Sequence, residues 1–367
     1  MRMYKFYRLI IFTIPLIFFL DSCTHRESCD LSLFRGDPAR TGVYQAVKRP
    51  SGGLLWKTDL GIWLMSTPAV YEGRIYVGSV RNKLYSVDNE TGKVLWDFTT
   101  GGAIASSPAV SGSTVYFGSA DKTLYAVDAE DGRKLWSFSD GSLINSSPNV
   151  VNGKVYFGTW KGRVYGLNAR DGKLIWEYSG CGKITSSPAY KDYVIYVGSW
   201  DKHLYAIDAK TGKLRWKYAT GAKVGSSPAV ADGLVFFGSM DKNIYCLEAG
   251  SGKLKWKYST DGWVDSSPSI DKGTVYACSM DRNIYALDYE GNLRWKFRTG
   301  GPIISSPALA GEILYVGSQD GHLYALYAKS GELTWRFKTG AAVNSSPVPY
   351  RDKLFIASYD SYIYALR

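Results

Sequence analysis

Short runs of alternating apolar and polar residues recur along the chain, separated by turns rich in Gly, Asp, Asn and Ser. In one copy, Ala109-Val110, Val115 to Phe117, Leu124 to Val127 and Leu135 to Phe138 are such runs. Alternation over about five residues, bounded by turn residues, predicts β-strands and leaves no room for a helix. Each copy is therefore predicted to be a four-stranded antiparallel sheet.

One tryptophan ends each copy, at a spacing of 40 residues with a single step of 39. A fixed period in this range, with four strands per copy, is typical of propeller blades. The sequence thus predicts an all-β, eight-bladed β-propeller. In the outer strands the tryptophans alternate with charged residues, so they are predicted to face inward and dock blade on blade. These residues are Trp56, Trp96, Trp136, Trp176, Trp216, Trp256, Trp295 and Trp335.

The two ends of the chain predict how the ring closes. The last copy stops at Arg367 after only three strands, whereas Gly53 to Thr58 forms an outer-strand pattern that precedes the first copy. This N-terminal strand is predicted to complete the last blade, which removes an edge that would invite aggregation. The predicted propeller domain covers residues 53–367.

Residues 1–22 have the pattern of a signal peptide, with a basic start and an apolar run of 12 residues from Leu9 to Leu20 that is too short to span a bilayer. Leu20-Asp21-Ser22-Cys23 resembles the bacterial lipobox, although Asp21 is unusual there. We therefore expect a lipoprotein with a lipid on Cys23; the alternative is a secreted protein that is simply cleaved. Thr24 after the cysteine favours the outer membrane in the sorting pattern of such lipoproteins.

Residues 23–52 are predicted to be a polar tether and leader. Within them, Arg35-Gly36-Asp37 matches an adhesion tripeptide, but three residues recur easily by chance. The formal net charge of +11 leaves a basic mature protein. Nucleic acid is not expected as a partner of an exported chain, and the lysine-rich outer strands either guard the sheet edges or attract acidic partners. We expect a monomeric propeller held to the membrane by its N-terminal lipid.

The copies differ at two positions that should share one rim of the ring, namely the residue leading into each inner strand and the residue after each second strand. The resulting set is rich in tryptophan, methionine and lysine, which is the composition of protein-binding hot spots. We predict a partner-binding rim here; the alternative is local packing over the blade tops. The predicted rim residues are Trp63, Trp160, Trp200, Trp263, Met240, Met280, Tyr359, Lys183 and Lys223.

Residues with catalytic or metal-binding potential occur in structural positions. Six aspartates, for example Asp241 and Asp281, recur in the same turn, where a carboxylate can bond the backbone two residues on. The three histidines do not have the number or spacing of a zinc site. The Ser-Ser pairs of the inner strands have no nearby histidine and are expected to line the central channel with hydroxyls. Cys246 and Cys278 replace small residues and are expected to be buried and unpaired.

The string from Tyr205 to Trp216 resembles the tryptophan-docking repeat of the pyrroloquinoline quinone (PQQ)-like propellers, which include quinoprotein dehydrogenases and non-enzymatic relatives. Some lipid-anchored, eight-bladed members are scaffold subunits of the machinery that assembles outer-membrane β-barrel proteins. The dehydrogenases use PQQ with calcium and typically a vicinal disulfide, but no two cysteines are adjacent here. We therefore expect a non-catalytic scaffold in the cell envelope, facing the periplasm, with no cofactor; the alternative is a PQQ-dependent dehydrogenase or PQQ-binding protein.

Overall fold

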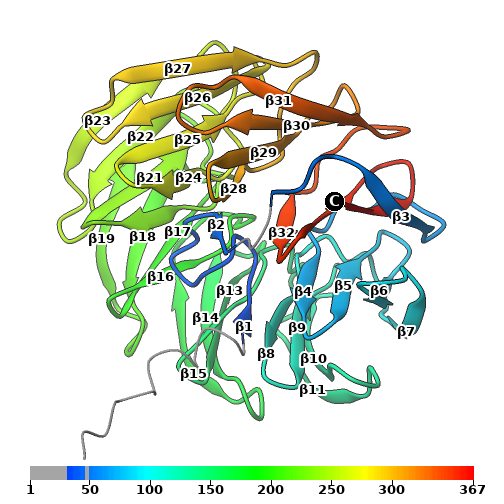
Figure 1. The fold of residues 1–367 in the computed structure, drawn as a ribbon. Coiled ribbons are helices and arrows are strands. Elements are labelled where there is room, and N and C mark those ends of the chain that lie inside the picture. The colour runs from blue at the N-terminus through cyan, green and yellow to red at the C-terminus, as the bar shows by residue number, and fades with distance from the viewer. Residues whose placement is uncertain (1–30, 46–48) are drawn as a thin grey trace, which may run out of the picture.

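The computed structural model describes residues 31–45 and 49–367, which form strands and turns without a helix. Eight sheets radiate around a central axis, as Figure 1 shows. Neighbouring sheets share apolar clusters, so that the core is distributed between blades. The predicted all-β, eight-bladed propeller is confirmed. The described residues contain no helix that is long and apolar enough to cross a membrane.

The strands of each blade follow one another from the axis outward. Blade one contains β4 (Ala69–Tyr71), β5 (Arg74–Gly78), β6 (Lys83–Asp88) and β7 (Val94–Thr99), and blade two contains β8 (Ala109–Ser111), β9 (Thr114–Gly118), β10 (Thr123–Asp128) and β11 (Lys134–Ser139). Blade three contains β12 (Asn149–Val151), β13 (Lys154–Gly158), β14 (Arg163–Asn168) and β15 (Leu174–Ser179), and blade four contains β16 (Ala189–Lys191), β17 (Val194–Gly198), β18 (His203–Asp208) and β19 (Leu214–Ala219). Blade five contains β20 (Ala229–Ala231), β21 (Leu234–Gly238), β22 (Asn243–Glu248) and β23 (Leu254–Ser259), and blade six contains β24 (Ser269–Asp271), β25 (Thr274–Cys278), β26 (Asn283–Asp288) and β27 (Leu293–Arg298). Blade seven contains β28 (Ala308–Ala310), β29 (Ile313–Gly317), β30 (His322–Tyr327) and β31 (Leu333–Lys338), and blade eight contains β32 (Val348–Tyr350), β33 (Lys353–Ala357), β34 (Tyr362–Leu366) and β3 (Leu54–Asp59).

The eighth blade is closed by the N-terminal strand β3, which pairs antiparallel with β34. Gly53 and Arg367 exchange two backbone hydrogen bonds, of 2.8 and 2.7 Å, so the two ends of the propeller are tied to each other. Figure 1 shows the C-terminus beside β3. The predicted closure is confirmed, and β34 has no open edge.

Each repeat tryptophan docks onto the next blade, as predicted. The indole N–H of Trp216 donates to the carbonyl of Ala249 at 3.0 Å, and the ring lies against Gly252, where an added Cβ would come within 2.6 Å of it. Gly252 has a φ of +70°, so the turn also needs glycine for its backbone conformation. The last tryptophan, Trp335, donates to the carbonyl of Pro50 just before β3.

The Ser-Ser pairs do not line the channel with free hydroxyls, and this prediction is wrong. The second residue of each pair accepts a hydrogen bond from the backbone N–H of its counterpart in the preceding blade, and the bond from Ser346 to Thr67 completes a ring of eight. The first hydroxyl instead accepts from the second strand of its own blade, as Ser106 does from Gly118 at 2.8 Å. The hydroxyls are buried because they join the inner strands.

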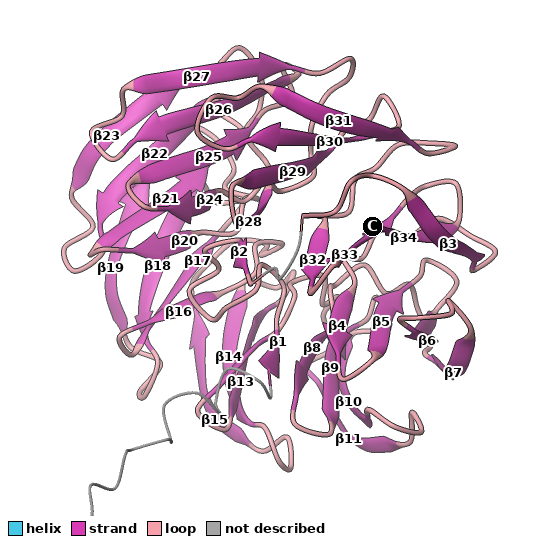
Figure 2. Ribbon diagram, in the orientation of Figure 1, coloured by secondary structure: helices cyan, strands magenta, loops and turns pink. Residues whose placement is uncertain are grey.

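The described part of the leader packs on the propeller, where the sequence predicted a tether. Its strands β1 (Leu31–Ser32) and β2 (Val43–Tyr44) join the inner edges of blades two and seven, and Figure 2 shows both near the middle of the ring. Between them, leader carbonyls accept hydrogen bonds from the backbone N–H groups of Tyr190, Val230 and Ile270 in blades four to six. The leader therefore runs as an arc across the inner strands.

Two arginines of this arc are fully buried at the axis. Arg35 donates to the carbonyls of Pro268 and Pro307, and Arg40 donates to those of Pro148 and Pro188. Burial lowers the pKa of Arg35 to about 10 and that of Arg40 to about 9. Since Arg35 is buried in these contacts, the adhesion tripeptide does not present its arginine to a receptor.

Two predictions fall outside the described residues, namely the signal peptide 1–22 and the lipid on Cys23. Of the described cysteines, Cys246 and Cys278 are buried and unpaired, as expected. Cys181 is also free and is only partly buried.

Candidate functional site

The two sets of variable positions do form one rim, because they are bonded to each other in seven of the eight blades. The backbone N–H of Trp200 donates to the carbonyl of Lys183, and Met280 donates to Trp263, each at 2.9 Å. Equivalent bonds occur in blades two, three, five, seven and eight. The inner strands then run from this rim, through the Ser-Ser-Pro segments, to the residues that pair with the leader. Rim and leader thus lie at opposite ends of the channel.

The recurring turn aspartates fix the geometry of the rim. Asp241 Oδ1 accepts from the backbone N–H of Asn243, two residues on, at 3.1 Å. Its Oδ2 accepts from Tyr245 Oη at 2.6 Å and from the N–H of Gly221 in the loop from the preceding blade. The structural role predicted for these aspartates is confirmed. Their carboxylates brace the rim.

Two of the predicted rim tryptophans are more than half exposed, Trp63 at 60% and Trp263 at 52%. Trp63 stacks on Tyr359 across the junction of blades one and eight, with 6.0 Å between ring centroids and 7° between planes. Met65 beside it is also exposed. Large apolar side chains of this exposure stand out on a folded surface and mark interaction sites when they gather.

The other two rim tryptophans, Trp160 and Trp200, are half-buried and contact lysine ammonium groups. The Lys183 ammonium lies 3.1 Å from the ring centroid of Trp160 and 3.8 Å from that of Trp200. Lys223 lies 4.1 Å from the same Trp200 ring, whose Nε1–H donates to Thr185. Each cation–π contact at such a site contributes about 0.5–1 kcal/mol. We call these four side chains the Trp–Lys cluster: Trp160, Lys183, Trp200 and Lys223.

Between the inner segments of blades five and six, below the rim, the structure places a carboxylate that the sequence did not single out. Asp265 directly precedes a Ser-Ser pair, and its Oδ1 is buried with no hydrogen-bond partner among the described residues. This oxygen occupies the space beside Gly225 in the neighbouring blade, since a Cβ added to Gly225 would lie 2.2 Å from Asp265 Oδ1. Burial raises the pKa of Asp265. Asn344, at the equivalent position of blade eight, also has a buried Oδ1 without a partner among those residues.

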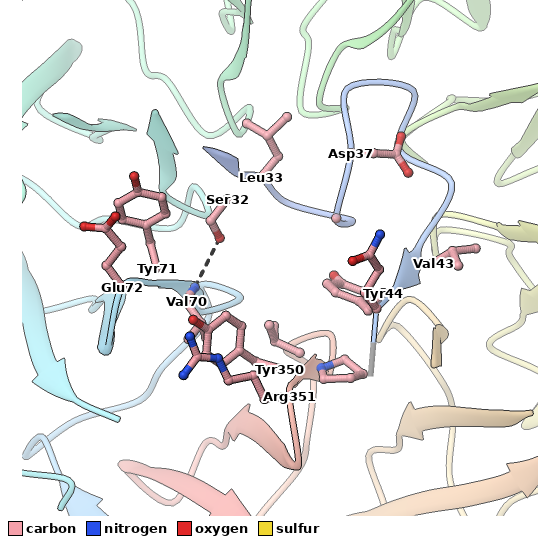
Figure 3. Close-up of a pocket in the computed structure, with 14 residues that line it drawn as sticks. Ser32, Leu33, Asp37, Val43, Tyr44, Val70, Tyr71, Glu72, Tyr350 and Arg351 are labelled. Atoms are coloured by element: carbon pink, nitrogen blue, oxygen red, sulfur yellow. Dashed lines mark hydrogen bonds between the residues drawn. The ribbon is translucent and has the colours of Figure 1, made fainter. Parts of the chain in front are cut away.

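At the opposite end, the leader arc leaves a cavity of about 620 Å³ over blades one and eight. Figure 3 shows Tyr71 and Tyr350 on its propeller side and Tyr44 on its leader side, with Ser32 bonded to Val70. Pro349 stands where other blades offer an N–H to the leader, for example Leu309 in blade seven. Because proline has no N–H, the arc is not continued on blade eight.

The described residues contain no group of three or more metal-binding side chains. His203 and His322 each lie beside an aspartate of their own turn, in blades four and seven. Cys181, Cys246 and Cys278 are unpaired. Among the described residues the rim thus offers aromatic surface and charge, and two unpartnered oxygens are buried below it.

Comparisons with known proteins agree with this architecture. The sequence model of the family of outer membrane protein assembly factor BamB matches residues 40–183, 180–244, 201–305 and 290–367. A search of curated proteins found no match.

Solved structures share the fold at low sequence identity. BamB from Moraxella catarrhalis is 18% identical, with a TM-score of 0.74 over 86% of this chain and 99% of that one. Quinohemoprotein alcohol dehydrogenase ADHIIG from Pseudomonas putida HK5 is 16% identical, with a TM-score of 0.81 over 93% of this chain and 80% of that one. The corresponding enzyme from Comamonas testosteroni is 16% identical, with a TM-score of 0.79 over 91% and 80%.

These structural likenesses establish the fold, which hosts both assembly factors and enzymes. The family match spans nearly the whole propeller and the end of the leader. The chain belongs to the family of outer membrane protein assembly factor BamB.

Proposed function

We propose that this protein is a non-catalytic propeller that docks a partner protein on its rim and serves as a scaffold in outer-membrane protein assembly. The observation that carries the proposal is the exposure of Trp63 and Trp263 on one face. Neither residue is one of the eight blade-docking tryptophans, and more than half of each side chain stays exposed although Trp63 stacks on Tyr359 of blade eight. Aromatic anchors of this kind dominate the energetics of protein interfaces.

The arrangement of the ends supports a membrane-anchored scaffold. If Cys23 carries a lipid, the stretch from Cys23 to Leu31 spans at most about 30 Å when extended. Leu31 pairs with blade two on the leader face. A lipid there would hold the leader face toward an outer membrane and direct the rim into the periplasm, where a protein partner can reach it.

The test is a pair of double variants in the full-length protein. Trp63→Ala with Trp263→Ala removes the two exposed indoles, whereas Leu135→Ala with Ile175→Ala removes apolar side chains of 39% and 43% exposure from outer strands. Co-purification of envelope proteins with the rim variant should fall at least tenfold against wild type, at an unchanged melting temperature. The outer-strand variant should retain wild-type recovery. Equal recovery with both variants would remove the rim from the proposal.

A second candidate function is PQQ binding, because the oxygens of Asp265 and Asn344 below the rim are buried without a partner among the described residues. Carboxylate and amide oxygens are ligands for Ca²⁺, which accompanies PQQ in the quinoprotein enzymes, but Ca²⁺ takes six to eight of them. The sequence has no adjacent cysteines that could cover the quinone ring. The residues thus fit the cofactor only in part, and we derive no catalytic step through it.

Calorimetric titration of residues 24–367 with PQQ and Ca²⁺ separates the two functions. The scaffold proposal expects neither heat nor a spectral change. Saturable micromolar binding that Asp265→Asn abolishes, together with dye reduction by an alcohol or sugar, would favour the enzyme.

A further inference from the structure

The Trp–Lys cluster carries two positive charges in close contact. Lys183 lies against the rings of both Trp160 and Trp200, and Lys223 also lies against Trp200. The pKa of Lys183 lies below its usual value, first because of burial and then because of the neighbouring Lys223 charge. The Trp200 indole therefore contacts two ammonium groups that repel each other.

Neither lysine is neutralised within the part of the chain that the structure describes. Neither forms an ion pair or a side-chain hydrogen bond there. The aspartate of the same rim turn, Asp201, already accepts hydrogen bonds from Gly182, His203 and Tyr205. Trp160 Nε1 is a buried donor without an acceptor among the same residues. The cluster thus offers several donors and positive charge.

The fold does not require these cations. The residues that stand at the position of Lys183 in blades two, three, seven and eight are Ala103, Leu143, Pro302 and Ala342. Their backbones make the same rim hydrogen bond as Lys183. Two uncompensated lysines beside half-buried aromatic rings are complementary to carboxylates flanked by apolar groups, since charge complementarity selects partners.

We propose that the Trp–Lys cluster binds a carboxylate side chain in an acidic, apolar-flanked segment of the partner protein. This inference rests on the docking function proposed above. The carboxylate lies between the Lys183 and Lys223 ammonium groups, which donate hydrogen bonds to it, and neighbouring apolar side chains of the segment cover the outer faces of Trp160 and Trp200. The segment extends from there across the rim toward Trp263.

The experiment measures binding of a fluorescein-labelled 12-residue peptide that contains four glutamates and two leucines, beside the same peptide with glutamines. At low salt we expect the glutamate peptide to bind wild type at least tenfold more tightly than the glutamine peptide. Lys183→Glu with Lys223→Glu should abolish this difference. Lys213→Glu with Lys253→Glu changes net charge equally on exposed residues at the opposite end of the blades and should preserve it.

A difference that survives Lys183→Glu with Lys223→Glu, or equal binding of both peptides to wild type, would overturn the inference. Vesicles of phosphatidylglycerol serve as a third probe. If only they bind and only the rim reversal releases them, a lipid headgroup replaces the acidic segment. Failure of this inference is distinguishable from failure of the docking function, because partner recovery with the Trp63 and Trp263 variant is measured separately. Melting temperatures confirm that each variant folds.

Discussion

At the residue scale, the surroundings of each tryptophan decide its role. Trp216 is half-buried, bonded to Ala249 and packed on a glycine turn of the next blade. Trp263 is 52% exposed on the rim. The same side chain thus contributes to stability in one place and offers binding surface in the other.

Truncation of these two tryptophans should separate the roles. Trp216→Ala removes a blade contact and should lower the free energy of unfolding by about 2–4 kcal/mol, near the lower end of the range for buried aromatic residues. Trp263→Ala, on the exposed rim, should change it by less than about 0.5 kcal/mol. Urea unfolding measures both. A similar cost for the two variants would contradict the assignment of roles.

We expect substitution of Asp265 to raise the stability of the protein in a pH-dependent way. Because burial raises its pKa, the folded protein holds this proton more tightly than the unfolded chain does. The free-energy cost of ionising the buried carboxyl in the folded protein is absent below the pKa of the unfolded chain near 4. This cost develops as pH rises through the pKa of the folded protein. Asp265→Asn should therefore stabilise the protein at pH 7 by about 0.5–2 kcal/mol, the usual size of a single stabilising substitution, and should give no gain at pH 3.

Asp241→Asn is the matched control for this measurement. The Asp241 carboxylate accepts four hydrogen bonds, so its loss should destabilise the protein at pH 7. Thermal unfolding across pH compares the two variants. Destabilisation by Asp265→Asn at pH 7 would show that an unrecognised donor satisfies the carboxylate.

At the element scale, the strands were predictable and the leader was not. Alternation along five-residue runs and the tryptophan period locate blades and ring closure, because these depend on local pattern. The burial of Arg35 and Arg40 depends on carbonyls 107 to 272 residues away, which only the closed ring brings together. The burial of Asp265 was not predictable for the same reason, since the space for its carboxylate exists only where Gly225 of the neighbouring blade lacks a side chain.

The leader arc should loosen locally when its arginines are truncated. Arg40→Ala removes bonds to blades three and four and should raise hydrogen exchange at the amides of Tyr190 and Val230. Arg35→Ala acts on blades six and seven and should raise it at Ile270 and Leu309. These four amides donate to leader carbonyls. Exchange measured by mass spectrometry that rises equally everywhere would show that the arginines support the whole fold instead.

At the scale of the whole molecule, closure through β3 should be essential to the ring. A chain that begins at residue 60 lacks the outer strand of blade eight and leaves the edge of β34 open, which favours association. We expect it to aggregate and to melt at lower temperature. A chain that begins at residue 31 should remain monomeric and keep its melting temperature. Size-exclusion chromatography with light scattering tests both, and a stable monomer from residue 60 onward would contradict the closure argument.

Site-specific photo-crosslinking in cells tests the central claim most directly. A photoreactive amino acid is placed at Trp63 or Trp263 on the rim and, as a control, at Leu135 or Ile175 on outer strands. The scaffold account predicts a discrete crosslinked envelope protein from both rim positions and none from the outer-strand positions. Crosslinks only from the outer strands, or none from the rim in a folded and exported protein, would contradict it.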